Sequence, residues 1–126
     1  MEMRYLFKGK TICGDWVRGL LANNGDKWYI SNNAGRPFAF EIRPDTICQC
    51  TGMKDKNGKL IWENDIVRTV YDGNEHIYQV VWDESELDFK AINGKENYES
   101  NFEYLPCCDE IEILGNCFDN PELLEV

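Results

Sequence analysis

The segment from Asn64 to Phe89 reads NDIVRTVYDGNEHIYQVVWDESELDF, and it decides the fold class predicted for this chain. The stretches Asp65 to Val70 and Ile77 to Trp82 are rich in β-branched and aromatic residues, and in the second of them large apolar residues recur at every other position. That alternation is typical of a half-buried strand. Between them, Asp72-Gly73-Asn74 tolerates the positive φ angles of a tight hairpin. The segment therefore predicts a β-hairpin followed by a further strand over residues 87 to 91, a meander that resembles the small SH3-like barrels.

The same signals extend over the rest of the chain. Turn dipeptides such as Asn24-Gly25 and Asn57-Gly58 separate short apolar segments. Further strands are predicted over residues 4–7, 16–20, 27–30, 38–42, 46–50 and 111–114. Helical signals are confined to Asn120-Pro121-Glu122, followed by two leucines, and to residues 98–105. We predict a mainly β fold (α+β at most), a short-stranded barrel or sandwich with an SH3-like barrel portion in the second half and a short C-terminal helical turn.

The length of 126 residues is that of one domain. A seam near residues 50–53 divides it into two candidate subdomains, 1–50 and 51–126, although no segment there has the composition of a flexible linker. Charged residues interrupt every apolar run near the amino terminus, and no segment has the length of a membrane span. We therefore expect a cytoplasmic protein that does not enter the membrane.

The charge of the chain is unevenly distributed. Residues 1–62 hold ten Lys and Arg against six Asp and Glu, a net charge of +4, and residues 63–126 hold three against seventeen, a net charge of −14. The overall charge of −10 disfavours a general nucleic-acid binder, because phosphate contacts need cations. The asymmetry is consistent with acidic loops that keep the protein soluble, with two surfaces for different partners, or with self-association of a basic face and an acidic one.

The six cysteines do not have the spacing of a zinc site. Cys48 and Cys50 are separated by one residue and Cys107 and Cys108 by none, whereas zinc ligands are usually two to four residues apart. A cytosolic chain also disfavours structural disulfides. Buried free cysteines are therefore the favoured interpretation, and neither a metal nor a cofactor is predicted.

The densest motif of the chain is Thr51-Gly52-Met53-Lys54-Asp55-Lys56-Asn57-Gly58-Lys59, which continues to Glu63-Asn64-Asp65-Ile66-Val67. With Gly14-Asp15-Trp16-Val17 near the start and Asp119-Asn120-Pro121-Glu122 near the end, it resembles the YopX family over essentially the whole chain. The resemblance implies a phage or prophage protein of uncharacterised activity. This chain departs from the family pattern at Asn64, where the family usually has glycine, and at Cys50 and Cys117.

The residue types of the motif suit turns. The family-motif residues of interest are Thr51, Gly52, Lys54, Asp55, Asn57, Gly58 and Asp65. Glycine, asparagine and aspartate all have turn roles, so the favoured interpretation of the motif is structural.

No catalytic set is visible in the sequence. The one histidine, His76, lies beside a predicted hairpin turn, and no nucleophile elbow, phosphate loop or metalloprotease motif occurs. We expect a protein that is not an enzyme and acts through contacts with a host or phage protein, or with itself as a homo-oligomer. Nucleic-acid binding by the basic half is a less favoured alternative, and a small enzyme or metal-dependent activity is a second one. The candidate interaction surface consists of Trp16, Trp62, Lys54, Lys56 and Lys59.

Overall fold

The computed structural model describes residues 6–31, 39–84, 88–92, 102–105 and 108–124. The chain forms two compact units, residues 1–52 and residues 53–126. Strand β5 (Cys48–Lys54) begins in the first unit and ends in the second.

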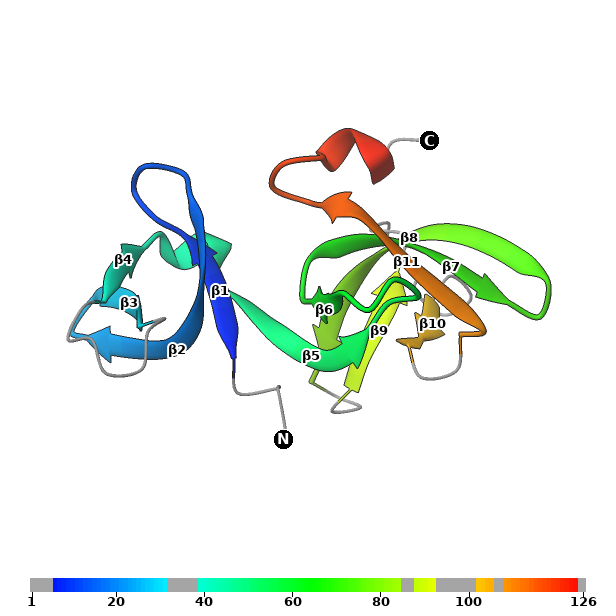
Figure 1. Cartoon of the computed structure of the whole chain (residues 1–126), viewed down its shortest axis with the longest axis horizontal. Helices are drawn as coiled ribbons and strands as arrows, with labels where there is room; N and C mark the ends of the chain where they lie inside the picture. Colours follow the sequence, from blue (N-terminus) through cyan, green and yellow to red (C-terminus); the bar gives the residue numbers. More distant parts are fainter. Residues whose placement is uncertain (1–5, 32–38, 85–87, 93–101, 106–107, 125–126) are drawn as a thin grey trace. The chain divides into compact units, whose positions relative to one another are not determined.

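The first unit is an antiparallel sheet with the strand order β4-β3-β2-β1-β5 (Figure 1). Its strands are β1 (Phe7–Lys10), β2 (Trp16–Asn24), β3 (Lys27–Ser31) and β4 (Phe40–Ile42), and a 3-10 turn, η1 (Pro44–Thr46), leads into β5. The sheet curls, because Thr11 forms a β-bridge with Ile42 and the amide of Arg43 donates to the carbonyl of Lys10 at 2.9 Å. The chain after β1 thus meets the end of β4.

The inner face of this curled sheet is packed closely around Ile42. Ile30 and Ile42 are 0% and 2% exposed. Gly9 is buried opposite them, and a Cβ at this position would overlap Cγ2 of Ile42. The small size of Gly9 is therefore what lets β1 approach β4.

The second unit contains an antiparallel five-stranded sheet with the strand order β10-β9-β8-β7-β11 (Figure 1). These strands are β7 (Asp65–Tyr71), β8 (Asn74–Asp83), β9 (Asp88–Ile92), β10 (Phe102–Tyr104) and β11 (Glu110–Asn116). The short strand β6 (Leu60–Trp62) pairs with β5, and the 3-10 turn η4 (Pro121–Leu124) follows β11.

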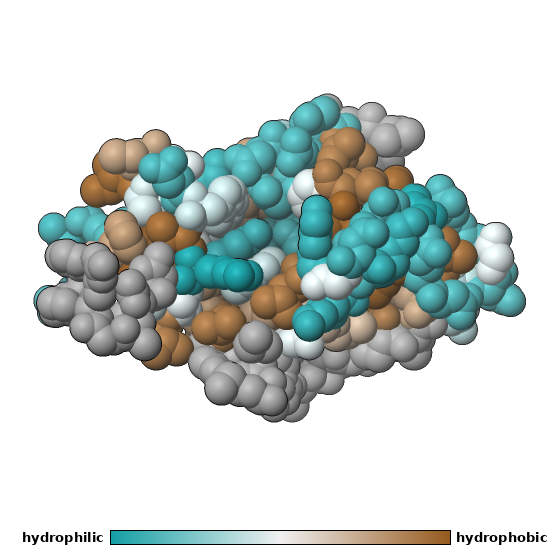
Figure 2. All heavy atoms as spheres, in the orientation of Figure 1, coloured by the Kyte–Doolittle hydropathy of each residue, from teal (hydrophilic) through white to brown (hydrophobic). Residues whose placement is uncertain are grey.

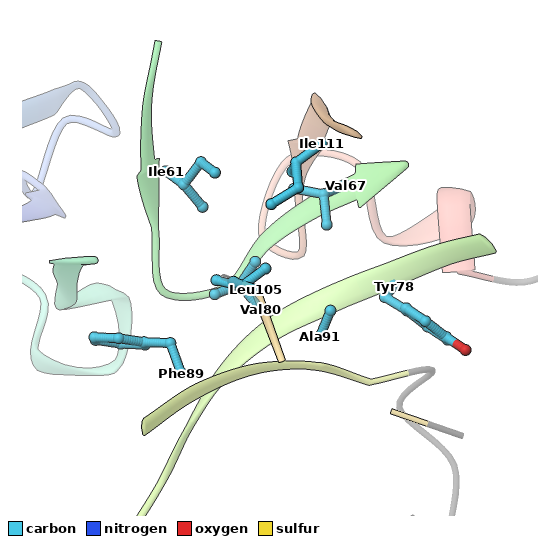
Figure 3. Packing of buried hydrophobic residues seen from close by; sticks show 8 residues of the cluster. All are labelled: Ile61, Val67, Tyr78, Val80, Phe89, Ala91, Leu105 and Ile111. Carbon is cyan, nitrogen blue, oxygen red and sulfur yellow. The ribbon is translucent and has the colours of Figure 1, made fainter. Parts of the chain in front are cut away.

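The core of the second unit is an apolar cluster on one face of this sheet (Figure 3). It consists of Ile61, Val67, Tyr78, Val80, Phe89, Ala91, Leu105 and Ile111. The alternation in the sequence explains it, because residues two apart on a strand share a face and β8 places both Tyr78 and Val80 inward. Ile61 of β6 joins the cluster and is fully buried.

The predicted mainly β fold is confirmed, and so is the C-terminal helical turn, which is the 3-10 turn η4. The β7–β8 hairpin forms as expected, with Asp72 and Gly73 at φ angles of 51° and 80° between the paired residues Tyr71 and Asn74.

Two expectations need correction. The second unit contains the predicted meander β7-β8-β9, but the sheet is open, because among the described residues its outer strands β10 and β11 do not pair with each other. The segment 98–105 is partly described, and there Phe102–Tyr104 is a strand and not a helical turn. No helix among the described residues has the length and apolar character needed to cross a membrane.

Candidate functional site

The motif aspartate Asp55 organises a loop of the second unit through both of its carboxylate oxygens. Oδ1 accepts hydrogen bonds from the backbone amides of Asn57 and Lys59, each at 2.9 Å. Oδ2 accepts one from the amide of Ile113 on β11 at 3.1 Å. The amide of Asp55 itself donates to the carbonyl of Lys59 at 2.8 Å, and Gly58 turns the loop with a φ angle of 81°. Asp55 is only 7% exposed, so these bonds lie largely out of contact with solvent.

These contacts determine the protonation of Asp55. Burial by itself raises the pKa of the carboxyl group, but the hydrogen bonds from the amides of Ile113, Lys59 and Asn57 outweigh burial, and the positive charge of Lys59 adds to them. The pKa of Asp55 is therefore lower than its usual value, and the group is ionised at neutral pH. A carboxylate with these partners holds the backbone of the loop in place.

The loop also covers the outer edge of β11. The amide of Lys56 donates to the carbonyl of Ile111 at 2.9 Å, next to the contact of Asp55 with Ile113. The backbone groups that Ile111 and Ile113 use here lie on the edge of β11 away from β7, so the loop occupies groups that an edge strand otherwise presents to solvent.

The second motif aspartate, Asp65, closes the turn between β6 and β7. Its Oδ2 accepts the amide of Trp62 at 2.8 Å, and Asp65 is 3% exposed. Within this turn Asn64 has a φ angle of 72°. The amide of Asn64 donates to Val80, its carbonyl accepts from Cys117, and its side-chain oxygen accepts from Gln79 at 3.0 Å.

The C-terminal motif is likewise a hydrogen-bonded turn. The side-chain oxygen of Asn116 accepts the amides of Phe118 and Asp119 at 3.0 and 2.9 Å. The amide of Asn120 donates to the carbonyl of Asn116 at 2.8 Å. Gly115 leaves room for Asn120, since a Cβ at position 115 would overlap the Asn120 amide group.

The remaining motif residues lie along the same path. Thr51 is buried, Gly52 has a φ angle of 82°, and the side chains of Lys54 and Asn57 are exposed. The two buried carboxylates of the motif, those of Asp55 and Asp65, both accept hydrogen bonds from backbone amides. The motif thus shapes the chain at two successive turns.

The residues of the predicted interaction surface belong to two different units. Trp62 is 5% exposed and is part of the interior. Trp16 belongs to the first unit, while Lys54, Lys56 and Lys59 belong to the second and are exposed. In the first unit the ammonium groups of Lys8 and Lys10 lie 4.7 and 5.3 Å from the centroid of the Trp16 ring.

A charged network covers the face of β7 and β11 opposite the core. The guanidinium of Arg68 donates to Glu112 and Glu75, each at 3.1 Å, and to Glu110. The hydrogen bonds to Glu110 and Glu112 raise the pKa of Arg68, and the bond from Arg68 lowers the pKa of Glu110. Lys56 approaches Glu110 at 3.6 Å. Figure 2 shows hydrophilic atoms predominating over this part of the second unit.

A hollow of about 380 Å³ lies at the end of the β8–β9 hairpin. Its described lining residues are Val81, Trp82, Asp83, Glu84, Lys90 and Ile92. The ammonium of Lys90 forms an ion pair with Asp83 at 2.7 Å, and Lys90 is 7% exposed. Trp82 packs edge-on against Phe89, with 4.9 Å between ring centroids, yet is 38% exposed.

The structure places Cys48 and Cys50 in the interior and His76 at the surface. Cys48 and Cys50 are buried, and the thiol of Cys48 donates to the carbonyl of Thr46 at 3.3 Å. Cys107 lies outside the described residues. His76 is exposed and stacks on Tyr78 with 5.1 Å between ring centroids. No three His, Cys, Asp or Glu side chains among the described residues are grouped as a metal site would need.

Sequence reasoning missed the hollow and the contact between Asp55 and Ile113. The hollow depends on the end of the β8–β9 hairpin, where the strand register places Val81 and Lys90 opposite each other. The hollow could have been predicted from the pairing of strands within the predicted meander. The contact between Asp55 and Ile113 joins residues 58 positions apart, and no local sequence pattern predicts it.

One family model covers the turns described above. No curated protein matches the chain. The family model described as YopX protein matches residues 8–125, which is nearly the whole chain and includes the Asp55 loop, the Asn64 turn and the Asn116 turn. The protein therefore belongs to the YopX family.

Proposed function

We propose that this protein is a non-catalytic interaction module of a phage or prophage, acting in the cytoplasm of the bacterial host and associating with further copies of itself. The phage setting comes from the family resemblance. The non-catalytic part is supported by the family motif, because the carboxylates of Asp55 and Asp65 are engaged by backbone amides.

The observation that carries the proposal is the exposed Trp82 beside the hollow at the β8–β9 end. Tryptophan is among the residues that contribute most to protein interfaces, and it does so where a neighbouring pocket admits a partner group. Here Val81 and Ile92 supply apolar walls, and Glu84 is exposed at the rim. The site thus combines an aromatic anchor with negative charge.

A second copy of the chain offers the complementary charge. Residues 1–52 hold seven Lys and Arg against five Asp and Glu, a net charge of +2, while residues 53–126 hold six against eighteen, a net charge of −12. Contact between the first unit of one copy and the hollow of another would be heterologous, and such contacts build rings or open chains. Electrostatic attraction of this kind weakens as salt rises.

Sedimentation velocity of the purified chain tests this proposal. The monomer has a mass of 14.7 kDa, and we expect larger species at low salt that dissociate as the salt concentration is raised. Glu84→Lys should shift the equilibrium to the monomer, because it reverses the charge at the rim of the hollow. Trp82→Ser should also shift the equilibrium to the monomer, and it should do so at any salt concentration.

Glu122→Lys is the matched control, since Glu122 is also an exposed acid of the second unit but lies on η4. It makes the same charge change and should leave association intact. A wild-type chain that stays at 14.7 kDa at low salt over all concentrations overturns the proposal. If Glu84→Lys and Glu122→Lys reduce association equally, the assignment of the contact surface to the hollow is overturned.

A further inference from the structure

One face of the β1–β2 hairpin carries three cations and an aromatic ring. The register of the two strands places Lys10 opposite Trp16 and Lys8 opposite Arg18. Cross-strand partners share a face, and so do residues two apart on one strand, so all four side chains lie on the same side of the sheet. We call these four residues the basic-aromatic surface.

This surface lies on the side of the sheet away from the core of the first unit. The intervening residues point to the other side, where Gly9 of β1 is packed against Ile42. Arg18 is exposed, and Trp16, Lys8 and Lys10 are half-buried. Among the described residues of β1 to β4, Glu41 is the only acid, and in the strand register it lies opposite Tyr29 of β3. The local charge of these strands is therefore positive although the whole chain is acidic.

Two positive charges lie close to the Trp16 ring. The ammonium groups of Lys8 and Lys10 lie 4.7 and 5.3 Å from the ring centroid, within the range of cation–π attraction. Like charges repel, and the electron-rich face of the indole offsets part of that repulsion. The result is a concentrated positive site around a planar aromatic group.

We propose that the basic-aromatic surface binds single-stranded nucleic acid, with phosphates contacting Lys8, Lys10 and Arg18 and a base stacking on Trp16. A single strand offers both of the groups that this surface matches, an anionic backbone and unpaired flat bases. A duplex keeps its bases stacked inside, so it uses the cations and not the ring. An acidic protein segment supplies carboxylates but no repeating aromatic planes.

A base that stacks on Trp16 leaves Lys8 and Lys10 close to the phosphates of the bound strand. A base that displaces an ammonium group from the ring leaves that group beside the phosphates of the same strand. Stacking of a base on an aromatic side chain stabilises a complex more than a surface cation–π contact does. The exchange therefore favours the bound strand.

Fluorescence anisotropy with labelled oligothymidine of about 15 nucleotides tests the proposal on the full chain. We expect binding that weakens between about 50 and about 200 mM salt. Lys8→Gln with Lys10→Gln should lower the slope of log affinity against log salt by about 0.7 for each phosphate that the variant no longer neutralises. Trp16→Leu should weaken binding about tenfold without changing that slope, while Trp16→Phe should retain most of the affinity.

The charge-matched control is Lys54→Gln with Lys59→Gln, which removes two exposed lysines from the second unit. It should bind like the wild type, and circular dichroism should show that every variant is folded. Glu84→Lys, which is designed to block self-association, should still bind the strand, so the two proposals can fail separately.

Three outcomes would show that the basic-aromatic surface does not bind the strand as proposed. They are no binding of the single strand at low salt, a larger decrease in affinity for the Lys54 and Lys59 control than for the Lys8 and Lys10 variant, and equal affinity of Trp16→Leu and the wild type. Tighter binding of a duplex of the same length, or displacement of the strand by poly-glutamate at equal charge concentration, assigns the surface to another partner and likewise overturns the proposal.

Discussion

The carboxylate of Asp55 accepts the backbone amide of Ile113 at 3.1 Å, across 58 positions of the chain. The same carboxylate accepts hydrogen bonds from the backbone amides of Asn57 and Lys59 within its own loop. One buried side chain therefore forms the loop and attaches it to β11. The family motif has a physical role here that requires no ligand.

Asp55→Asn should destabilise the second unit by about 2–3 kcal/mol, since the charged acceptor is removed and the amide group of the new side chain faces a backbone donor. Urea unfolding followed by tryptophan fluorescence measures this decrease. Glu84→Gln is the control, because Glu84 is exposed and its neutralisation should change stability by less than about 0.5 kcal/mol. Equal stability of Asp55→Asn and the wild type would contradict the role assigned to this carboxylate.

The stability contributed by Asp55 should depend on pH in a definite direction. Burial raises the pKa of Asp55 and the amide hydrogen bonds lower it more, so the folded pKa lies below that of the unfolded chain, about 3.9. The unfolded chain thus takes up the proton first, and the stabilisation is complete above about pH 5 and is lost as the pH falls through the lower, folded pKa. The difference in unfolding free energy between the wild type and Asp55→Asn should be constant from about pH 5 to 7 and shrink below about pH 4. A difference that grows on acidification would show that the pKa is raised.

Asn64→Ala should cost more stability than Asn64→Gly. Both changes remove the hydrogen bond from Gln79, but alanine is also strained at a φ angle of 72°, which glycine adopts freely. We expect a decrease of about 1 kcal/mol for glycine and about 2–3 kcal/mol for alanine. Thermal unfolding of the two variants gives the order, and a more stable alanine variant would refute the backbone argument.

Gly9→Ala should destabilise the first unit by about 1–3 kcal/mol, because the new Cβ overlaps Cγ2 of Ile42. A double-mutant cycle separates this overlap from the reduced backbone freedom. Ile42→Ala alone should cost about 2–5 kcal/mol, since it leaves a cavity. The double variant should be more stable than the sum of the two single effects predicts, and strict additivity would place the strain elsewhere.

Most strands of the fold could be predicted from the sequence, because their cause is local. Alternation over residues 77–82 and the Asp72-Gly73 turn specify the β7–β8 hairpin, and the structure has it with the expected turn. The C-terminal turn was equally accessible, since Pro121 at the first position and Asn120 before it suit a helical start.

The features that escaped prediction depend on contacts distant in sequence. The three-residue strand β6 has no pattern of its own and is fixed by Ile61 entering the core. Trp62 is predicted as part of the interaction surface, yet its backbone amide donates to Asp65 and the residue is buried. Lys8, Lys10 and Trp16 lie close together in the sequence, but the register that brings them to one face is visible only in the sheet.

The loop that covers β11 has a consequence for misfolding. An open sheet with a bare outer strand is a template on which other chains can add strands without limit, as in cross-β fibrils. Here the amide of Lys56 and the carboxylate of Asp55 already occupy the outward groups of Ile111 and Ile113. Removal of the Asp55 carboxylate would therefore do more than lower the free energy of unfolding. It would leave backbone groups on the outer edge of β11 open to pairing with a strand of another chain.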